Sequence, residues 1–226
     1  MLSQNLIQFL YNLRDNNNRE WFHNNNETYQ IVKKEFEQFI ALVIMEISQF
    51  DSSIQNVNPK ECIFRINRDI RFSNNKSPYK NNFGGFIVPG GRNAGYAGYY
   101  VHIEPENCFL AGGIYMPPAD RLKAVRTEIY ENTDVFKKII HDKTFVKYFG
   151  ELSAEDKLKQ PPKGFPKDFS DIDLLKYKHY TVAKNISEDL IVSKQYIKET
   201  IDTFKVLYPF NQFINEAINY QLSLDN

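Results

Sequence analysis

The sequence predicts a single α+β domain over residues 1–226, with helices at both ends and a mainly antiparallel sheet between them. Apolar residues recur at helical spacing before residue 50 and after residue 118. Between about residues 61 and 116 the period changes to strand-like alternation. The strands there follow one another through tight turns and not through helices, which is typical of antiparallel pairing. The sheet is therefore expected at about residues 61–116, packed by the N- and C-terminal helices.

The N-terminal part predicts three helices. Four apolar residues at helical spacing predict the first: Leu6, Phe9, Leu10 and Leu13. Three asparagines at 16–18 end it, and a second helix is expected from about Arg19. A long third helix is expected over about 27–49, because its apolar residues form one stripe: Phe36, Phe39, Ile40, Val43 and Ile47.

The middle of the chain predicts the sheet. Residues 61–66 alternate as a strand with Cys62, Phe64 and Ile66 on one side, and residues 83–88 form the next strand. Residues 89–98 are rich in glycine and favour a hairpin loop. Residues 99–103 alternate, residues 104–107 suit a tight turn, and residues 108–115 return as the partner strand.

The C-terminal part returns to helices after residue 118. Helices are expected through residue 129, from about residue 133 to residue 140, and over 171–176, and residues 179–182 are expected to be extended. The last two helices are expected at about 193–207 and 211–222, with Pro209 separating them.

Composition indicates an ordinary globular protein. The chain has 226 residues, 42% hydrophobic residues and a formal net charge of zero. The N-terminus has no basic segment followed by an apolar run, and no window is apolar enough to cross a bilayer. We therefore expect a cytoplasmic protein that is not associated with a membrane. Cys62 and Cys108 lie in no metal-binding spacing, so no metal site is expected. They are typical of reduced core residues, with a disulfide as the alternative.

The positive charge is concentrated in one segment. Residues 60–92 carry seven basic and two acidic residues, and five of the basic residues lie within the stretch RINRDIRFSNNKSPYK at 65–80. Arginine and lysine there predict a site for phosphate or carboxylate oxygens. The candidate anion-binding residues are Arg68, Arg71, Lys76, Tyr79 and Lys80, with Arg126 joining from a later helix. Asp69 is expected to orient the arginines. The alternative is a structural network of ion pairs.

A histidine and a carboxylate lie two residues apart in the same predicted strand. His102 and Glu104 would project from one face together with Tyr100, opposite the apolar face. This pair could perform general acid–base catalysis, so we take His102 and Glu104 as the candidate catalytic residues. The pair could also be two of three metal ligands, although no third ligand is evident. The remaining alternative is a polar strand face turned to solvent.

One motif resembles a known family. The run Arg68-Asp69-x-Arg71-Phe72-Ser73-x-x-Lys76-Ser77-Pro78-Tyr79-Lys80 resembles the signature of the bacterial and fungal family catalogued as domain of unknown function 2461. The similarity extends to other short stretches along the chain: Asn18–Phe22, Gly98–His102, Gly112-Gly113, Pro162–Phe165 and Leu174–Lys176. The resemblance implies one intact domain and supplies no activity.

Three functions are compatible with these residues. The first is a binding domain or enzyme for a small phosphorylated or carboxylated molecule, with the reaction and any cofactor left open. The second is a nucleic-acid-binding module, which the zero net charge disfavours. The third is a protein-interaction domain in which the basic loop is structural.

Overall fold

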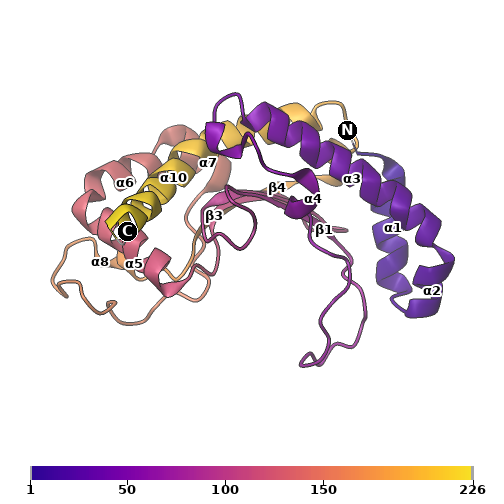
Figure 1. The fold of residues 1–226 in the computed structure, drawn as a ribbon, viewed down its shortest axis with the longest axis horizontal. Coiled ribbons are helices and arrows are strands. Elements are labelled where there is room, and N and C mark those ends of the chain that lie inside the picture. The colour runs from indigo at the N-terminus through magenta and orange to yellow at the C-terminus, as the bar shows by residue number, and fades with distance from the viewer. Residues whose placement is uncertain (1, 225–226) are drawn as a thin grey trace. The chain divides into compact units, whose positions relative to one another are not determined.

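The computed structural model describes residues 2–224 and confirms the α+β class. Its strands form one four-stranded antiparallel sheet in the order β1-β2-β3-β4 (Figure 1). The elements are, in chain order, α1 (Gln4–Asp15), α2 (Arg19–Asn24), α3 (Asn26–Ile47), the 3-10 helix η1 (Ser52–Ile54), α4 (Pro59–Cys62), β1 (Phe83–Ile87), β2 (Gly98–Ile103), β3 (Cys108–Ile114), α5 (Ala119–Glu131), α6 (Thr133–Ile140), α7 (Lys143–Phe149), α8 (Ile172–Leu175), β4 (Tyr180–Ile186), α9 (Glu188–Ile191) and α10 (Tyr196–Leu224).

The chain divides into two compact units. Unit 1 holds the residues up to Arg92 together with Tyr100–Leu110 and Asn185–Asp202. Unit 2 holds Asn93–Tyr99, Ala111–Lys184 and the residues from Thr203 onward. The single domain expected over residues 1–226 stays a prediction.

The N-terminal helices of unit 1 form as the sequence predicts. All four residues of the first apolar stripe are buried in α1, and all five of the predicted stripe are buried in α3. The Asn18 side chain accepts a hydrogen bond from the Trp21 backbone N–H and so caps α2. Helix α3 packs on α1, on α4 and on β1.

Aromatic rings connect these helices to the start of the sheet. Phe36 of α3 lies against Phe83 of β1, with ring centroids 5.4 Å apart, and Phe83 is stacked on Tyr29 at 6.3 Å. Tyr29 in turn contacts Phe22 at 4.9 Å, and Phe22 is stacked on Tyr79 at 3.9 Å. This run of five rings fixes the base of the basic loop to the core of unit 1.

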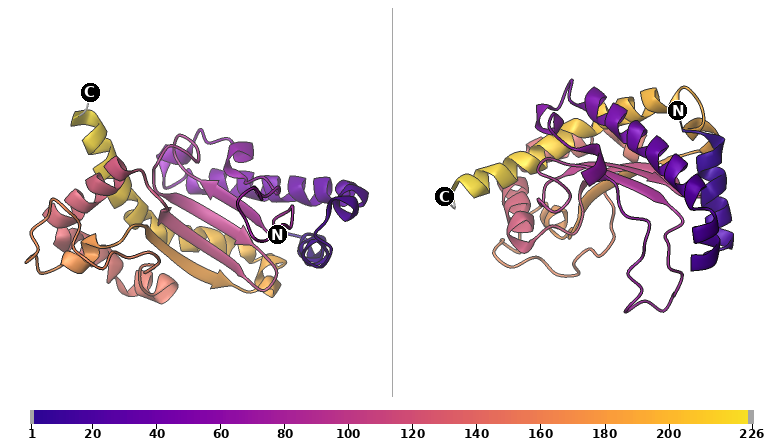
Figure 2. Two further views of the ribbon diagram at one scale, coloured as in Figure 1. Left: turned by 90° about the horizontal axis from the view of Figure 1, so that it is seen from below. Right: turned by 45° about the vertical axis from the view of Figure 1, so that its right-hand side comes forward.

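The strand predicted at residues 61–66 does not form. Asn58 caps one helical turn, α4, because its side chain accepts from the Lys60 backbone N–H and Pro59 suits the first helical position. The segment that follows pairs only through two isolated bridges, Ile63 with Gly85 and Asn67 with Tyr79. Between α4 and β1 the chain makes a long excursion away from α3 (Figures 1 and 2).

The sheet also extends beyond residues 61–116. Its fourth strand is β4, in the stretch where the sequence predicts only extended backbone at 179–182. The first three strands therefore lie within residues 83–114, and the fourth is Tyr180–Ile186.

The break predicted at Pro209 is also wrong, because α10 runs continuously from Tyr196 to Leu224. A proline inside a helix removes one backbone hydrogen bond and costs about 3 kcal/mol. On either side of Pro209, Leu207 and Phe210 are fully buried. Burial of such side chains contributes about 1.5–3 kcal/mol each, enough to keep the helix whole.

In unit 2, strands β3 and β4 approach closely at a glycine. Gly113 has φ +102°, and a Cβ built on it would lie 2.0 Å from the Tyr180 carbonyl oxygen and 3.0 Å from the Phe210 ring. Only a residue without a side chain fits this position.

The two cysteines are placed as the sequence predicts. Cys62 and Cys108 are free thiols in the core, and burial raises the pKa of each to about 11. Among the residues from 2 to 224, no helix has the length and apolar character needed to cross a membrane.

Candidate functional site

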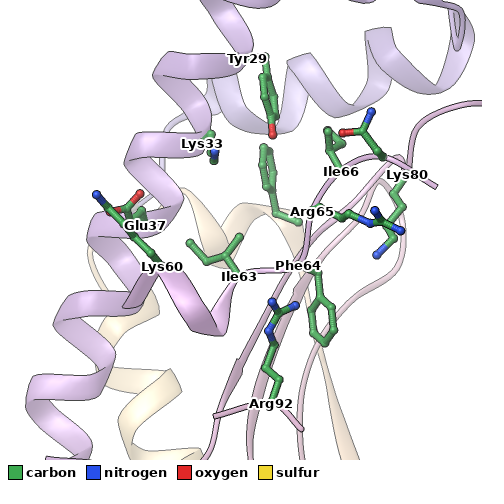
Figure 3. Close-up of a pocket in the computed structure, with 12 residues that line it drawn as sticks. Tyr29, Lys33, Glu37, Lys60, Ile63, Phe64, Arg65, Ile66, Lys80 and Arg92 are labelled. Carbon is green, nitrogen blue, oxygen red and sulfur yellow. The ribbon is translucent and has the colours of Figure 1, made fainter. Parts of the chain in front are cut away.

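A pocket of about 670 Å³ opens in unit 1 beside the start of β1 (Figure 3). Helix α3 forms one wall, and the irregular segment after α4 forms the other. The lining residues are Tyr29, Lys33, Glu37, Lys60, Ile63, Phe64, Arg65, Ile66, Asn67, Lys80, Phe83 and Arg92.

The basic side chains of the pocket outnumber its acids. Lys33 lies over the Tyr29 ring at 6.0 Å, and Lys60 contacts Glu37 at 3.9 Å. The three remaining basic residues form no ion pair with any residue of the described range: Arg65, Lys80 and Arg92. We call these three the cation cluster.

Like charges meet in the cation cluster. Burial lowers the pKa of Lys80, and the charges of Arg65 and Arg92 lower it further. The folded protein thus holds three positive groups close enough to repel one another. An anion that bound there would relieve this repulsion.

An aromatic ring supports the cation cluster. The Phe64 ring lies 5.2 Å from Lys80 Nζ and 4.8 Å from Arg92 Cζ. Its backbone N–H donates to the Gly84 carbonyl at 2.9 Å, which fixes the ring next to β1. Contacts of this kind contribute about 0.5–1 kcal/mol and hold the two cations on the ring face.

Two of the predicted anion-binding residues form contacts within their own loop. Arg68 donates to the Ser77 carbonyl at 3.1 Å and to Ser73 Oγ at 3.4 Å. Lys76 Nζ donates to the Ile70 carbonyl at 3.1 Å. Both side chains thus close the loop on itself through carbonyl and hydroxyl oxygens.

Asp69 and Arg71 form a bidentate pair with each other. Arg71 Nε and Nη2 donate to the two Asp69 oxygens at 3.0 and 2.7 Å. The pair lowers the pKa of Asp69. Both side chains are exposed, so the pair contributes little to stability. That Asp69 orients Arg71 toward a ligand stays a prediction.

Tyr79 and Lys80 lie where the loop returns to the sheet. Tyr79 is buried, and its backbone exchanges two hydrogen bonds with the Asn17 side chain, at 3.0 and 3.1 Å. A second pocket of about 390 Å³ brings Tyr79 and Lys80 together with Arg68 and Arg14. Lys80 is therefore part of the wall of both pockets.

Arg126 lies in unit 2. Its Nη2 donates to the Tyr177 carbonyl at 2.8 Å. A role for Arg126 in anion binding stays a prediction.

The two candidate catalytic residues belong to a hydrogen-bonded chain. Tyr100 Oη lies 2.9 Å from His102 Nδ1, and His102 Nε2 lies 3.0 Å from Glu104 Oε2. His102 is stacked on Phe109 with centroids 4.4 Å apart and is only 8% exposed. The strand face that carries His102 is therefore closed to solvent at this residue. Catalysis by His102 and Glu104 stays a prediction.

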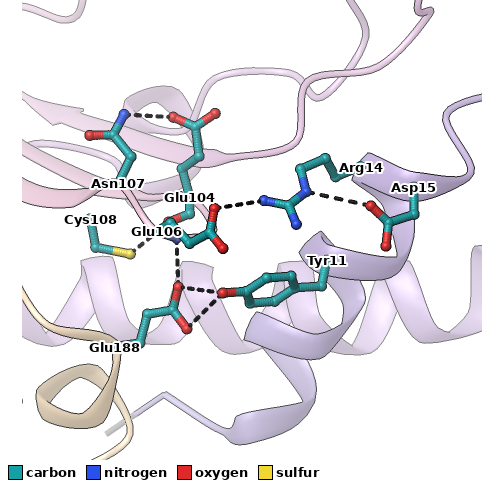
Figure 4. Close-up of polar contacts among 8 residues, drawn as sticks. All are labelled: Tyr11, Arg14, Asp15, Glu104, Glu106, Asn107, Cys108 and Glu188. Carbon is teal, nitrogen blue, oxygen red and sulfur yellow. Dashed lines mark hydrogen bonds and ion pairs between the residues drawn. The ribbon is translucent and has the colours of Figure 1, made fainter.

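Glu104, at the end of this series of hydrogen bonds, is held in place by the turn between β2 and β3 (Figure 4). Asn107 Nδ2 donates to Glu104 Oε2 at 2.9 Å. Arg14 of α1 donates to the Glu106 carboxylate at 3.1 Å, and the Glu106 backbone N–H donates to Glu188 at 2.6 Å. The turn thus presents Glu104 to His102 in a single orientation.

The burial of His102 predicts a stability change with pH. Burial lowers the pKa of His102, and this outweighs the Glu104 contact, which raises it; the charge of Lys80 lowers it further. Between the folded pKa and the unfolded value of about 6.5, the unfolded chain binds more protons. The free energy of unfolding therefore falls as the pH drops below about 6.5 and levels off below the folded pKa.

Urea unfolding at several pH values between 5 and 8 checks this prediction on the wild type and on His102→Gln. The variant has no titratable group at this position, so its free energy of unfolding should fall less than that of the wild type as the pH drops. Parallel curves for the two proteins would contradict the assignment.

Sequence reasoning overlooked two members of the cation cluster. Arg65 belongs to the basic stretch at 65–80, and the available signal was its place between Phe64 and Ile66 in the alternating pattern. Arg92 follows the two glycines of the loop after β1, where the sequence suggests only a turn. Arg92 and Lys80 come together because of the course that the irregular segment between α4 and β1 takes, and no local sequence pattern predicts that course.

Comparison with known proteins identifies one family. A family model described as "Conserved hypothetical protein (DUF2461)" matches residues 5–213. A search of the curated proteins found no match, and a search of the solved structures found none either. Within residues 2–224, no group of three or more His, Cys, Asp or Glu side chains is placed to hold a metal ion.

Proposed function

The chain belongs to the family of conserved hypothetical proteins designated DUF2461, and we propose that it binds a small phosphorylated or carboxylated molecule at the cation cluster. The observation that carries this proposal is the set of three cations, Arg65, Lys80 and Arg92, lining one pocket without an acidic partner among the described residues. Arginine forks bind carboxylate and phosphate oxygens in pairs, and lysine adds a point charge.

The pocket suits a small ligand. Its volume of about 670 Å³ lies within the range of ordinary ligand sites, roughly 300–1,000 Å³. Phe64 and Tyr29 supply apolar surface beside the charges, so a ligand with an anionic group and a carbon skeleton could contact both. We also propose a cytoplasmic location, which the two free, buried thiols support.

Thermal unfolding at fixed ionic strength tests the binding. The probes are phosphate, pyrophosphate, citrate, nucleotides and sugar phosphates, each with the wild type and with Lys80→Met. A ligand at about 100 times its Kd adds roughly 2.7 kcal/mol, which raises the Tm of a chain of this size by about 5–10 °C. Lys80→Met keeps most of the apolar stem and should lose this shift.

Lys163→Met is the matched control, because Lys163 is an exposed lysine of unit 2. It removes the same charge and should keep the full shift. A flat screen on the wild type, or an equal shift in Lys80→Met, would contradict the proposal.

A second candidate, binding of single-stranded nucleic acid, is supported by the loop between α4 and β1. Phe72 there is 95% exposed, and Arg71 Cζ lies 5.9 Å from its ring centroid. Exposed rings beside cations are suited to base stacking. A short oligonucleotide in the same screen distinguishes the two candidates. Binding that weakens steeply with salt and is lost in Phe72→Ala would favour the second.

A further inference from the structure

The hydrogen-bonded chain behind Tyr100 determines what its hydroxyl can bind. The carboxylate of Glu104 can only accept hydrogen bonds, so His102 Nε2 must carry the proton between them. Burial disfavours the charged form of His102, so its other nitrogen, Nδ1, is an acceptor. The Tyr100 hydroxyl therefore donates its proton to His102 at 2.9 Å.

The Tyr100 oxygen is left as an acceptor. A phenol has one proton, and here it is directed at His102, so only lone pairs remain for another partner. Burial and the charge of Glu104 raise the pKa of Tyr100 to about 12, so the phenol keeps its proton at neutral pH. A group that binds to this oxygen must itself be a donor.

Tyr100 and two members of the cation cluster lie against the same aromatic ring. Tyr100 meets the Phe64 ring edge-on, with centroids 6.2 Å apart, and the same ring contacts Lys80 and Arg92. The Tyr100 hydroxyl lies over Gly84, where a Cβ would come within 2.6 Å of it. Tyr100 itself is only half-buried.

We propose that Tyr100 selects the ligand by accepting a hydrogen bond from a hydroxyl that the ligand carries near its anionic group. The ligand is then a phosphorylated polyhydroxy compound, of the sugar phosphate or polyol phosphate class. His102 and Glu104 are positioning residues, because they act by fixing the direction of the Tyr100 proton. This inference rests on the proposed anion site.

Calorimetric titration with glycerol 3-phosphate and n-propyl phosphate tests the inference. Both probes carry one phosphate on three carbons, and only the first has hydroxyls. The wild type should bind glycerol 3-phosphate about five- to tenfold more tightly, which is the usual contribution of one hydrogen bond. Tyr100→Phe keeps the ring but lacks the hydroxyl. It should bind the two probes equally, with the affinity that the wild type has for n-propyl phosphate.

His102→Phe separates positioning from general support of the fold. It removes the partner that fixes the direction of the Tyr100 O–H, so the hydroxyl is no longer held as an acceptor for the ligand. The preference between the probes should therefore shrink while the propyl phosphate affinity stays unchanged. A merely structural role would change both affinities together, and that result would overturn the positioning role.

The remaining outcomes separate the two proposals. Equal binding of both probes by the wild type, or a preference that survives in Tyr100→Phe, would overturn the selection by Tyr100 and leave the anion site standing. Failure of the wild type to bind either probe, pyrophosphate or citrate would overturn both.

Discussion

Gly113→Ala should destabilise the protein by at least about 4 kcal/mol, which few single substitutions reach. The positive φ of +102° alone strains an L side chain by about 1–3 kcal/mol. The new Cβ would also lie 2.0 Å from the Tyr180 carbonyl oxygen, so β3 and β4 would have to separate. The free energy of unfolding from urea titration measures the loss.

Gly164→Ala is the control for backbone strain. Gly164 has φ +91°, close to that of Gly113, and no atom lies within 4 Å of its built Cβ. It should cost only the strain, about 1–3 kcal/mol. Equal losses in the two variants would show that the contact with β4 does not matter.

Phe36→Ala should cost about 3–5 kcal/mol, because a fully buried ring leaves a cavity when it is removed. Phe36 supports Phe83, which in turn is stacked on Tyr29 in the pocket wall. We therefore expect weaker ligand binding as well as lower stability. Urea unfolding measures the first effect, and the ligand-induced Tm shift measures the second.

Ile31→Ala on the same helix is the control for Phe36→Ala. Ile31 is 62% exposed, so its loss should change the free energy of unfolding by no more than about 0.5 kcal/mol. A similar loss at both positions would contradict the packing of α3 on β1.

The elements that the sequence predicts correctly are those built from local patterns. The apolar stripe of α3 and the tight turn between β2 and β3 each lie within a short window, and both form as expected. The strand expected at 61–66 fails because a cap at Asn58 and a proline at position 59 start a helical turn that competes with its alternation. The membership of β4 in the sheet depends on a partner far away in the chain, so local patterns could not reveal it.

In the candidate site, too, local patterns predict some features and miss others. Charge counting locates the basic segment, but it cannot tell a cation that closes its own loop from one that faces a pocket. Arg68 and Arg65 lie three residues apart, yet Arg68 donates to Ser77 while Arg65 lines the pocket. The chain of Tyr100, His102 and Glu104 was easier to anticipate, because alternate residues of a strand share a face.

On the proposed function, binding of an anion to the cation cluster would connect the supply of ligand to the lifetime of the protein in the cell. A bound anion that adds about 2.7 kcal/mol reduces the unfolded population roughly a hundredfold. Degradation that starts from unfolded chains would slow in proportion. The cellular abundance of this protein would then rise and fall with the concentration of its ligand. In a protein substituted at Lys80, the abundance would no longer follow the ligand.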